Sequence, residues 1–302
     1  MLKQDHLRPE TSVIIPCKNE GRNLKMTIDS ILAASQDAPP GKLEIVVVDD
    51  GSDDGCGDFL KETGICGSLR YIPTPGLGVA QARNLGAAAA RGEYLIFCDA
   101  HITVPAGWLD NLLEPLKQGL FDAVAPAIGA LENPAAVGYG QTWDEQLQVA
   151  WLPPPRQMQP GAAPLLPGGC VAVRAGAFWE AGGFDHGFIV WGIEDVELSL
   201  KMWLFGFRLG VNPSVKVLHL FRKKHPYPVK MDHFLYNMLR MAYSHFNNER
   251  VEKVMRLVER NGSSQMINQR VLRGGALQQR SQYLARRKYD DDWFMKKFKI
   301  NF

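Results

Sequence analysis

The sequence lacks several features that would assign it to other classes of protein. None of its 302 residues lies in an uninterrupted apolar run of about 20 residues, the length that a membrane-spanning helix needs. The amino-terminal segment MLKQDHLRPETS has no apolar stretch and does not resemble a secretory signal. A net charge of +2 is too small for a dedicated nucleic-acid-binding protein, so no nucleic-acid partner is expected.

Cysteine is scarce, and internal repeats of the solenoid type are missing. The five cysteines are Cys17, Cys56, Cys66, Cys98 and Cys170, and their spacing matches neither a CxxC motif nor a zinc site. Because five cysteines cannot all pair in disulfides, reduced and mostly buried thiols of a cytoplasmic protein are the preferred interpretation. The hydrophobic fraction of 46% and the charged fraction of 22% are ordinary for a globular protein.

The chain does contain an alternation of short apolar strands and helical patterns. The expected elements lie at 12–15, 23–34, 43–48, 80–90, 94–98, 168–173, 193–205 and 215–219. Such alternation predicts a parallel α/β sheet with helices on both faces. We expect a catalytic domain over 1–229 and a helical, basic extension over 230–302. The proline-rich segment 153–167 is expected to be a mobile surface loop, which could act as a lid ordered by a bound donor.

Three polar clusters follow expected strands, after Pro16, Val48 and Cys98. In parallel sheets, ligands bind beyond the carboxyl ends of the strands, so the clusters predict the rim of a pocket. After Val48 come Asp49 and Asp50, which could accept hydrogen bonds from a base or a ribose hydroxyl. They could equally form an Asx-type turn, and both hold if Asp49 closes the turn while Asp50 faces the ligand.

The triplet Asp99-Ala100-His101 places a carboxylate and an imidazole on the same side of an extended segment, because side chains alternate there. Hard cations such as Mg²⁺ and Mn²⁺ prefer oxygen ligands, and an imidazole favours Mn²⁺. A pair of this kind alone is also found in exposed turns. Its position after a buried strand, beside the other two clusters, favours a metal site.

Two further clusters lie in the second half of the chain. Glu194 and Asp195 begin an expected helix, where the helix dipole alone would favour carboxylates. In a catalytic role, one of them could remove the proton of an acceptor hydroxyl while the other binds a sugar. His219 ends a strand and precedes a run of cations, which suits a metal ligand beside a diphosphate; without that context the run is a basic surface loop.

Together these motifs resemble glycosyltransferases of the GT-A fold, over residues 11–227. The segments SVIIPCKNE and VVVDDGSDD are similar to family 2 of these enzymes. The motifs at 99–101, 168–169, 191–197 and 219–227 are similar to those of polypeptide N-acetylgalactosaminyltransferases. The resemblance implies a Rossmann-like nucleotide-sugar-binding sheet flanked by helices, a UDP-sugar donor, and Mn²⁺ or Mg²⁺ as cofactor.

The resemblance also implies roles for individual residues. Those implied in donor binding are Pro16, Glu20, Asp50, Arg83, Asp99, Gly168, Gly169, Trp191, Arg222 and Tyr227. The implied metal ligands are Asp99, His101 and His219, and the implied catalytic pair is Asp195 and Glu194. Asp50 would contact the uridine, Arg83 the diphosphate and Glu194 the sugar.

Two departures from the N-acetylgalactosaminyltransferase pattern shape the functional prediction. Neither the membrane anchor nor the lectin domain of that family is found in the sequence, so a Golgi enzyme is not expected. Asp195 stands where that retaining family has asparagine, and an aspartate after the glutamate is typical of inverting enzymes, in which it acts as base. We therefore expect an inverting transferase that moves a hexose or N-acetylhexosamine to a hydroxyl of a glycan, a peptide or a small molecule.

Other functions stay open. One is a retaining transferase of the polypeptide N-acetylgalactosaminyltransferase type, and another is a nucleotide-sugar-binding protein without catalysis. A nucleotidyltransferase is less favoured, because residues 16–21 lack the glycines of a triphosphate loop. The basic carboxyl-terminal helices could cap the core, contact an anionic membrane surface or hold an acceptor. Capping is preferred, although a peripheral position at the inner membrane face stays open.

Overall fold

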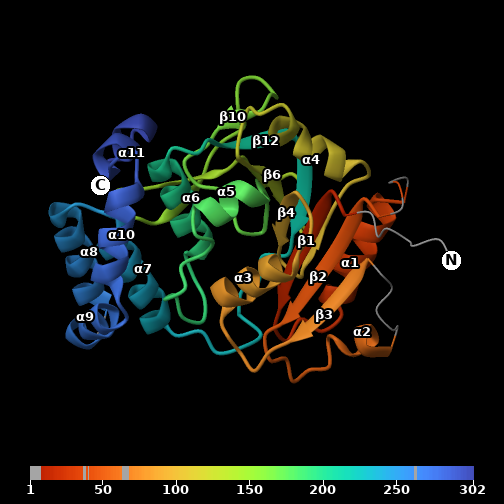
Figure 1. Cartoon of the computed structure of the whole chain (residues 1–302), viewed down its shortest axis with the longest axis horizontal. Helices are drawn as coiled ribbons and strands as arrows, with labels where there is room; N and C mark the ends of the chain where they lie inside the picture. Colours follow the sequence, from red (N-terminus) through yellow and green to blue (C-terminus); the bar gives the residue numbers. More distant parts are fainter. Residues whose placement is uncertain (1–7, 37–38, 40, 63–67, 262–263) are drawn as a thin grey trace.

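The computed structural model describes residues 8–36, 39, 41–62, 68–261 and 264–302. A central sheet is covered by helices on both faces, and a group of helices from the carboxyl-terminal part of the chain lies at one end of the molecule (Figure 1). The expected α/β architecture, with a helical carboxyl-terminal region, is confirmed.

The central sheet is mixed, with the strand order β10-β12-β6-β11-β4-β1-β2-β3; β5 pairs with β12 and β7 with β6. Its strands are β1 (Thr11–Cys17), β2 (Leu43–Asp49), β3 (Leu69–Pro73), β4 (Tyr94–Cys98), β5 (Ile102–Thr103), β6 (Ala123–Ala130), β7 (Val137–Gly138), β10 (Gly161–Ala162), β11 (Cys170–Arg174) and β12 (Leu209–His219). A separate hairpin is formed by β8 (Gln141–Trp143) and β9 (Val149–Trp151).

The prediction of a parallel sheet is wrong at β11 and at the short strands β5, β7 and β10, which are antiparallel to their partners. Strands β1 to β4 are parallel, and β6 and β12 are parallel to each other, but β11 lies antiparallel between β4 and β6. A parallel neighbour needs a long crossover, usually a helix. Here the chain passes from β6 to β11 through the short strands β7 to β10 instead, which allows the reversed direction.

The helices pack on the sheet in two layers and continue into the carboxyl-terminal group. They are α1 (Asn23–Ala34), α2 (Asp58–Glu62), α3 (Val79–Ala89), α4 (Trp108–Lys117), α5 (Ala175–Glu180), α6 (Glu194–Phe205), α7 (Met231–His245), α8 (Asn248–Asn261), α9 (Ser264–Arg273), α10 (Ala276–Arg286) and α11 (Asp291–Phe298).

Alternation along the strands separates two apolar clusters, one on each face of the sheet. In β1, Val13 and Ile15 join the cluster that includes α1 and α4, whereas Ile14 joins the one that includes α3, α6 and α7. Both faces are covered, which explains why the strands are continuously apolar in sequence. Helix α3 approaches the sheet so closely that a Cβ at Gly86 would lie 2.4 Å from Ile14 Cγ2.

The carboxyl-terminal helices are joined to the rest of the protein by a buried ionic cluster. Glu197 of α6 pairs with Lys201 Nζ at 3.1 Å and with His245 Nε2 of α7 at 2.8 Å, and both carboxylate oxygens are used. The side chains of Glu197 and Lys201 are fully buried. Burial opposes ionisation of Glu197, but the Lys201 charge and the His245 hydrogen bond outweigh it and hold the pKa of Glu197 below its ordinary value.

Several cations of the basic extension bind backbone carbonyls within the fold. Arg280 Nη1 donates to Tyr243 O at 2.9 Å, Arg287 Nη1 donates to His245 O at 3.0 Å, and Arg286 donates to Glu180 O. Helix carbonyls at carboxyl ends carry partial negative charge, so these contacts are favourable. Part of the excess of basic residues in this region therefore binds the helices to the rest of the fold.

The division of the chain into a catalytic domain that ends at residue 229 and an extension that begins at residue 230 stays a prediction.

We expect Glu197→Ala to lower the free energy of unfolding by about 3–5 kcal/mol, since it leaves Lys201 buried without its carboxylate. Urea unfolding at neutral pH measures the change. Because the folded pKa of Glu197 is lowered, this stability is present above the ordinary pKa of glutamate and lost as the pH falls through the folded value. Asp29→Ala, which removes an exposed pair with Lys25, is the control and should cost under about 1 kcal/mol. Equal effects of the two changes would contradict the role of the cluster.

Candidate active site

The structure brings the site residues expected from the sequence to one cavity of about 850 Å³. Those lining it are Pro16, Glu20, Asp50, Arg83, Asp99, His101, Gly168, Gly169, Trp191, Glu194, Asp195, His219, Arg222 and Tyr227. The sheet explains this gathering: β1, β2, β4 and β12 run in the same direction, so their carboxyl ends share an edge, and β11, which is reversed, begins there. Individual roles remain predictions.

The candidate metal ligands come from two strand ends. Asp99 follows β4, and His219 is the last residue of β12, whose pairing with β5 places it opposite Ile102, next to His101. Potential ligand atoms of Asp99, His101 and His219 all lie within 4.8 Å of one another. His219 Nε2 is 3.1 Å from Asp99 Oδ2, and the two imidazole centroids are 4.7 Å apart.

The surroundings of these three side chains fit a divalent cation. Glu20 Oε2 lies 3.2 Å from His101 Nδ1, an outer carboxylate that can orient the ring and leave Nε2 for an ion. His219 Nδ1 is buried and has no hydrogen-bond partner among the described residues. One carboxylate with two imidazoles suits Mn²⁺ better than Mg²⁺, which prefers oxygen ligands.

Asp99 is held in the ionised form that a metal ligand requires. Burial opposes ionisation, but the hydrogen bond to His219 and the charge of Arg83 outweigh it and hold the pKa of Asp99 well below its ordinary value. Its Oδ1 accepts from Arg83, which leaves Oδ2 on the side of His219.

Arg83 of α3 is 2% exposed and connects the centre of the site. Its Nη1 donates to Glu194 Oε1 at 2.8 Å, and its Nη2 donates to Asp99 Oδ1 and Gly168 O, each at 2.9 Å. Both terminal nitrogens are therefore bound to protein oxygens rather than directed into the open cavity. The predicted contact of Arg83 with a diphosphate stays a prediction.

Glu194 and Asp195 begin α6, as the sequence predicted to within a residue. Glu194 Oε2 accepts from Gly192 N at 3.2 Å, and burial raises the pKa of Glu194 to about 7. Asp195 Oδ2 accepts from Gly168 N at 2.7 Å and Oδ1 from Val196 N at 2.9 Å, and burial raises the pKa of Asp195 as well. Asp195 thus anchors the Gly168-Gly169 segment.

At the end of β2, Asp49 closes the expected turn by accepting from Ser52 N at 2.8 Å. Asp50 does not point freely into the cavity. Its Oδ1 accepts from Thr74 Oγ1 and Leu77 N, and its Oδ2 accepts from Gly78 N at 2.9 Å. Asp50 therefore orders the loop that leads into α3. Its predicted contact with uridine stays a prediction.

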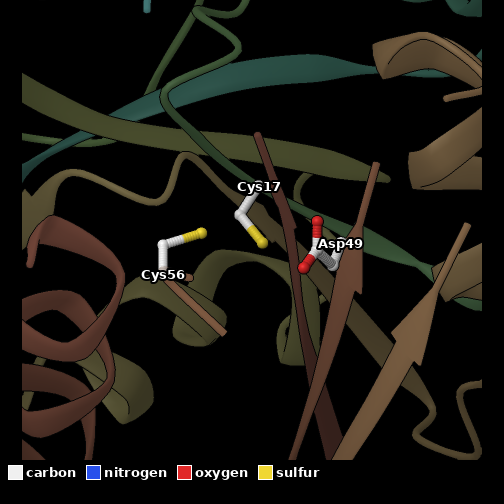
Figure 2. A group of neighbouring side chains, drawn as sticks. All are labelled: Cys17, Asp49 and Cys56. Carbon is white, nitrogen blue, oxygen red and sulfur yellow. The ribbon is translucent and has the colours of Figure 1, made fainter. Parts of the chain in front are cut away.

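Beneath this turn, Cys17 and Cys56 lie beside Asp49 (Figure 2). Their potential ligand atoms are close enough to consider a metal, but Asp49 Oδ2 already accepts from the Tyr71 hydroxyl and Oδ1 from Ser52 N. We interpret the group as an internal hydrogen-bond cluster and Asp99–His101–His219 as the metal candidate.

The cysteines are free thiols at the four positions that the structure describes, as predicted, whereas Cys66 lies outside the described residues. Cys98 and Cys170 are cross-strand partners with their Sγ atoms 3.7 Å apart. Cys98 directly precedes Asp99, and Cys170 directly follows Gly169. A second pair of thiols therefore lies next to residues of the site.

Sequence reasoning missed the part of the cavity wall that comes from β8–β9, including Gln141, Gln148 and Trp151. These strands have three residues each, too few for an alternating pattern to be recognised. Trp151 packs edge-on against Phe221, with ring centroids 6.1 Å apart. Within the proline-rich segment, residues 153–162 are exposed but 163–167 are buried, so the surface-loop prediction is wrong for its last five residues.

The fold and the site define the class of protein: a glycosyltransferase of the GT-A fold. A model described as glycosyl transferase family 2 matches residues 12–182, more than half of the chain, and one described as the N-terminal domain of galactosyltransferase matches residues 160–226. The chain belongs to glycosyl transferase family 2.

Curated relatives and solved structures agree with this assignment. Polypeptide N-acetylgalactosaminyltransferase 10 of Rattus norvegicus is 34% identical over 242 residues, which are 73% of this chain and 39% of the relative. Polypeptide N-acetylgalactosaminyltransferase 4 of Mus musculus is 35% identical over 263 residues, 80% of this chain and 44% of the relative. The chain thus spans about two fifths of the length of such relatives.

Among solved structures, GalNAc-T7 with UDP, GalNAc and Mn²⁺ superposes with a TM-score of 0.75 at 23% identity, covering 98% of this chain and 57% of the other. Mannosyltransferase PcManGT from Pyrobaculum calidifontis, in complex with GDP-Man and Mn²⁺, gives a TM-score of 0.55 at 23% identity over 92% of this chain and 74% of the other. At these identities the likeness shows the fold.

The prediction of a cytoplasmic protein, at the inner membrane face or free, is wrong. The relatives are polypeptide N-acetylgalactosaminyltransferases, which are enzymes of the Golgi lumen and not of the cytoplasm. An odd cysteine count and an unremarkable amino-terminal segment do not determine a compartment. In the part of the chain that the structure describes, no helix combines the length and apolarity needed to cross a membrane.

We expect Glu20→Ala to weaken Mn²⁺ binding about ten- to a hundredfold, because an outer carboxylate that orients a ligating imidazole is removed. Isothermal titration of the protein with Mn²⁺ measures the affinity. The control is Glu93→Ala, at an exposed position outside the cavity. Equal affinities of the Glu20 and Glu93 variants would remove Glu20 from the support of His101.

Proposed function

We propose that this chain transfers an N-acetylhexosamine from a UDP-sugar to an acceptor hydroxyl, with Mn²⁺ as cofactor and with retention of the anomeric configuration. The observation that carries the proposal is the cluster of Asp99, His101 and His219 on the wall of the cavity. The names of the relatives support the sugar, and the ligands in the GalNAc-T7 structure support the nucleotide and the ion.

The three clustered side chains would hold the ion, and an ion so placed stabilises the charge of a departing diphosphate. Around it, this chain supplies fixed dipoles and cations. Arg222 is held by Glu20 beside His101, and Tyr227 also lines the cavity. Groups that are positioned before the donor binds need little reorganisation when charge develops.

The stereochemical proposal departs from the inversion expected from the sequence. That expectation rested on Asp195 acting as base, but both oxygens of Asp195 accept backbone N–H groups, from Gly168 and Val196. The amide oxygen of an asparagine can accept the Gly168 N–H equally well. The aspartate therefore performs a task compatible with the retaining relatives, in which asparagine stands at this position. Inversion remains the alternative, supported by the galactosyltransferase-type match over 160–226.

The acceptor is proposed as a peptide hydroxyl, on the names of the relatives, with a glycan hydroxyl as the alternative. The cavity wall formed by β8–β9 and by the loop with Phe221 presents aromatic surface, which suits either acceptor. No finding supports the membrane contact considered for the basic helices.

We expect the protein to release UDP from UDP-N-acetylgalactosamine in the presence of Mn²⁺, and Asp99→Ala to slow the release by about 10²- to 10³-fold. A coupled UDP assay with and without chelator measures the rate. Asp110→Ala, at an exposed carboxylate on α4, is the control and should act like the unchanged protein. UDP binding without release from any donor of a UDP-sugar panel would favour the non-catalytic alternative.

Asp195→Asn distinguishes the two stereochemical proposals. Under retention, the variant should keep activity within about tenfold, because the amide still binds the Gly168 N–H. Under inversion, loss of the base should lower the rate by about 10²- to 10⁴-fold. The anomeric coupling constant in the NMR spectrum of the product gives an independent answer, and a product of inverted configuration would overturn retention.

A further inference from the structure

The turn that leads into α6 has a strained backbone. Val190, Gly192 and Ile193 have φ angles of 51°, 112° and 57°. Branched side chains such as those of valine and isoleucine rarely adopt the left-handed region. Conformations of this kind persist only where the surrounding structure enforces them.

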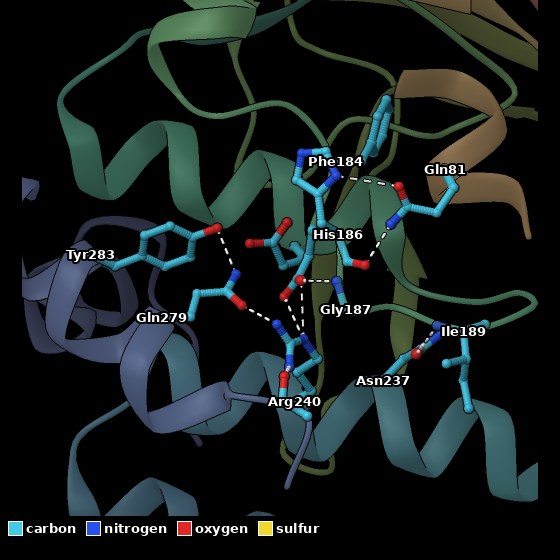
Figure 3. Close-up of polar contacts among 12 residues, drawn as sticks. Gln81, Phe184, His186, Gly187, Ile189, Asn237, Arg240, Gln279 and Tyr283 are labelled. Atoms are coloured by element: carbon cyan, nitrogen blue, oxygen red, sulfur yellow. Dashed lines mark hydrogen bonds and ion pairs between the residues drawn. The ribbon is translucent and has the colours of Figure 1, made fainter. Parts of the chain in front are cut away.

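One side chain of the carboxyl-terminal helices makes most of the contacts that enforce this turn. Asn237 of α7 is 1% exposed, and its Oδ1 accepts from Ile189 N at 3.0 Å. Its Nδ2 donates to Ile189 O at 3.0 Å, to Trp191 O at 3.3 Å and to Gly192 O at 3.1 Å. In Figure 3, Asn237 reaches from its helix to Ile189.

The turn is also confined from two sides. On one side, Val79 N of α3 donates to Val190 O at 2.9 Å, and a Cβ at Gly78 would lie 2.9 Å from Val190 N. On the other side, a Cβ at Gly192 would lie 3.1 Å from Phe234 Cδ2. Space for the turn is therefore set by packing, while four of its hydrogen bonds involve the amide of Asn237.

A neighbouring ion pair fixes α7 itself against the segment that precedes the turn. Arg240 Nε donates to both oxygens of Asp185 at 3.0 Å, and Arg240 also donates to Gln279 of α10 (Figure 3). Gly187 N donates to Asp185 Oδ1 at 2.7 Å. Asn237 and Arg240 lie three residues apart, on one face of the helix.

The turn positions two residues of the candidate site, Trp191 and Glu194. Gly192 N donates to Glu194 Oε2, and Glu194 Oε1 accepts a hydrogen bond from Arg83, which also donates to Asp99. The Trp191 ring lies against His225, with centroids 4.4 Å apart. A displaced turn would therefore move both Trp191 and Glu194 relative to the metal candidate.

We propose that Asn237 is a positioning residue, which couples the carboxyl-terminal helices to the donor site by holding the turn 189–193. The inference rests on the proposed glycosyltransferase function. The contacts of Asn237 are with the backbone of the turn, so this residue acts through Trp191 and Glu194 rather than by touching the donor.

The test compares Asn237→Asp and Asn237→Ser with Tyr243→Phe. The aspartate keeps the shape but directs a carboxylate at three carbonyl oxygens, and the serine shortens the side chain. The control removes a hydroxyl of the same helix that contacts Asn268 at 2.8 Å, away from the turn. Steady-state hydrolysis of UDP-N-acetylgalactosamine gives kcat, titration with UDP and Mn²⁺ gives the nucleotide affinity, and hydrogen exchange reports the amides of 189–193.

We expect kcat to fall about ten- to a hundredfold in either Asn237 variant that folds, because small misplacements of reacting groups have effects of this size. UDP affinity should change less than about threefold, since Asp50 and the metal candidate are untouched. Exchange at 189–193 should be faster in these variants only. A general loss of structure would instead lower UDP affinity and speed exchange throughout the chain, and that result would overturn the inference.

Unchanged kcat in a folded Asn237 variant would also overturn the positioning role. If the unchanged protein releases no UDP from any donor, the proposed function fails, and hydrogen exchange then decides the inference separately. Unaltered protection of 189–193 in both Asn237 variants refutes it, and selective loss of that protection supports it.

Discussion

The buried guanidinium of Arg83 holds together parts of the site that are far apart in the sequence. Glu194 begins α6, Asp99 follows β4, and Gly168 precedes β11, yet all three oxygens that bind Arg83 lie within 2.9 Å of its terminal nitrogens. A buried arginine without partners would be very unfavourable, so its presence requires the carboxylates to be near. Together with the hydrogen bond to His219, the Arg83 charge lowers the pKa of Asp99 against the effect of burial.

This arrangement explains why the pKa values of the two carboxylates near Arg83 are shifted in opposite directions. Asp99 receives hydrogen bonds from Arg83 and His219, and its pKa is lowered. Glu194 is more deeply buried and close to Asp195, and its pKa is raised to about 7 even though Arg83 opposes the shift. Separation of pKa values between neighbouring acids is a common property of catalytic sites. The metal candidate and the part of the cavity wall formed by Glu194 can thus carry different charges at neutral pH.

Much of the site could be predicted from the sequence, because its residues lie at positions fixed by a simple rule. Apolar runs locate strands, and polar residues directly after parallel strands must share an edge, which brings together Asp50, Asp99 and His219. The direction of β11 could not be predicted, since its first four residues, 170–173, are apolar and fit a strand of either direction equally well. The partners of Asp50 and Arg83 were also out of reach, because long-range hydrogen bonds leave no periodic signal.

Asn237 is the clearest example of a residue whose role could not be predicted from the sequence. In the sequence it is one polar residue in a helix of mixed character, and nothing near it resembles a catalytic motif. Its importance appears only when the backbone of 189–193 is known, because the groups it binds are main-chain atoms whose identity does not depend on the sequence of the turn. The motif that contains Trp191 and Glu194 can therefore be recognised without the helix that holds it. It follows that a boundary drawn between a catalytic domain and a helical extension would separate the turn from the side chain that satisfies its hydrogen bonds.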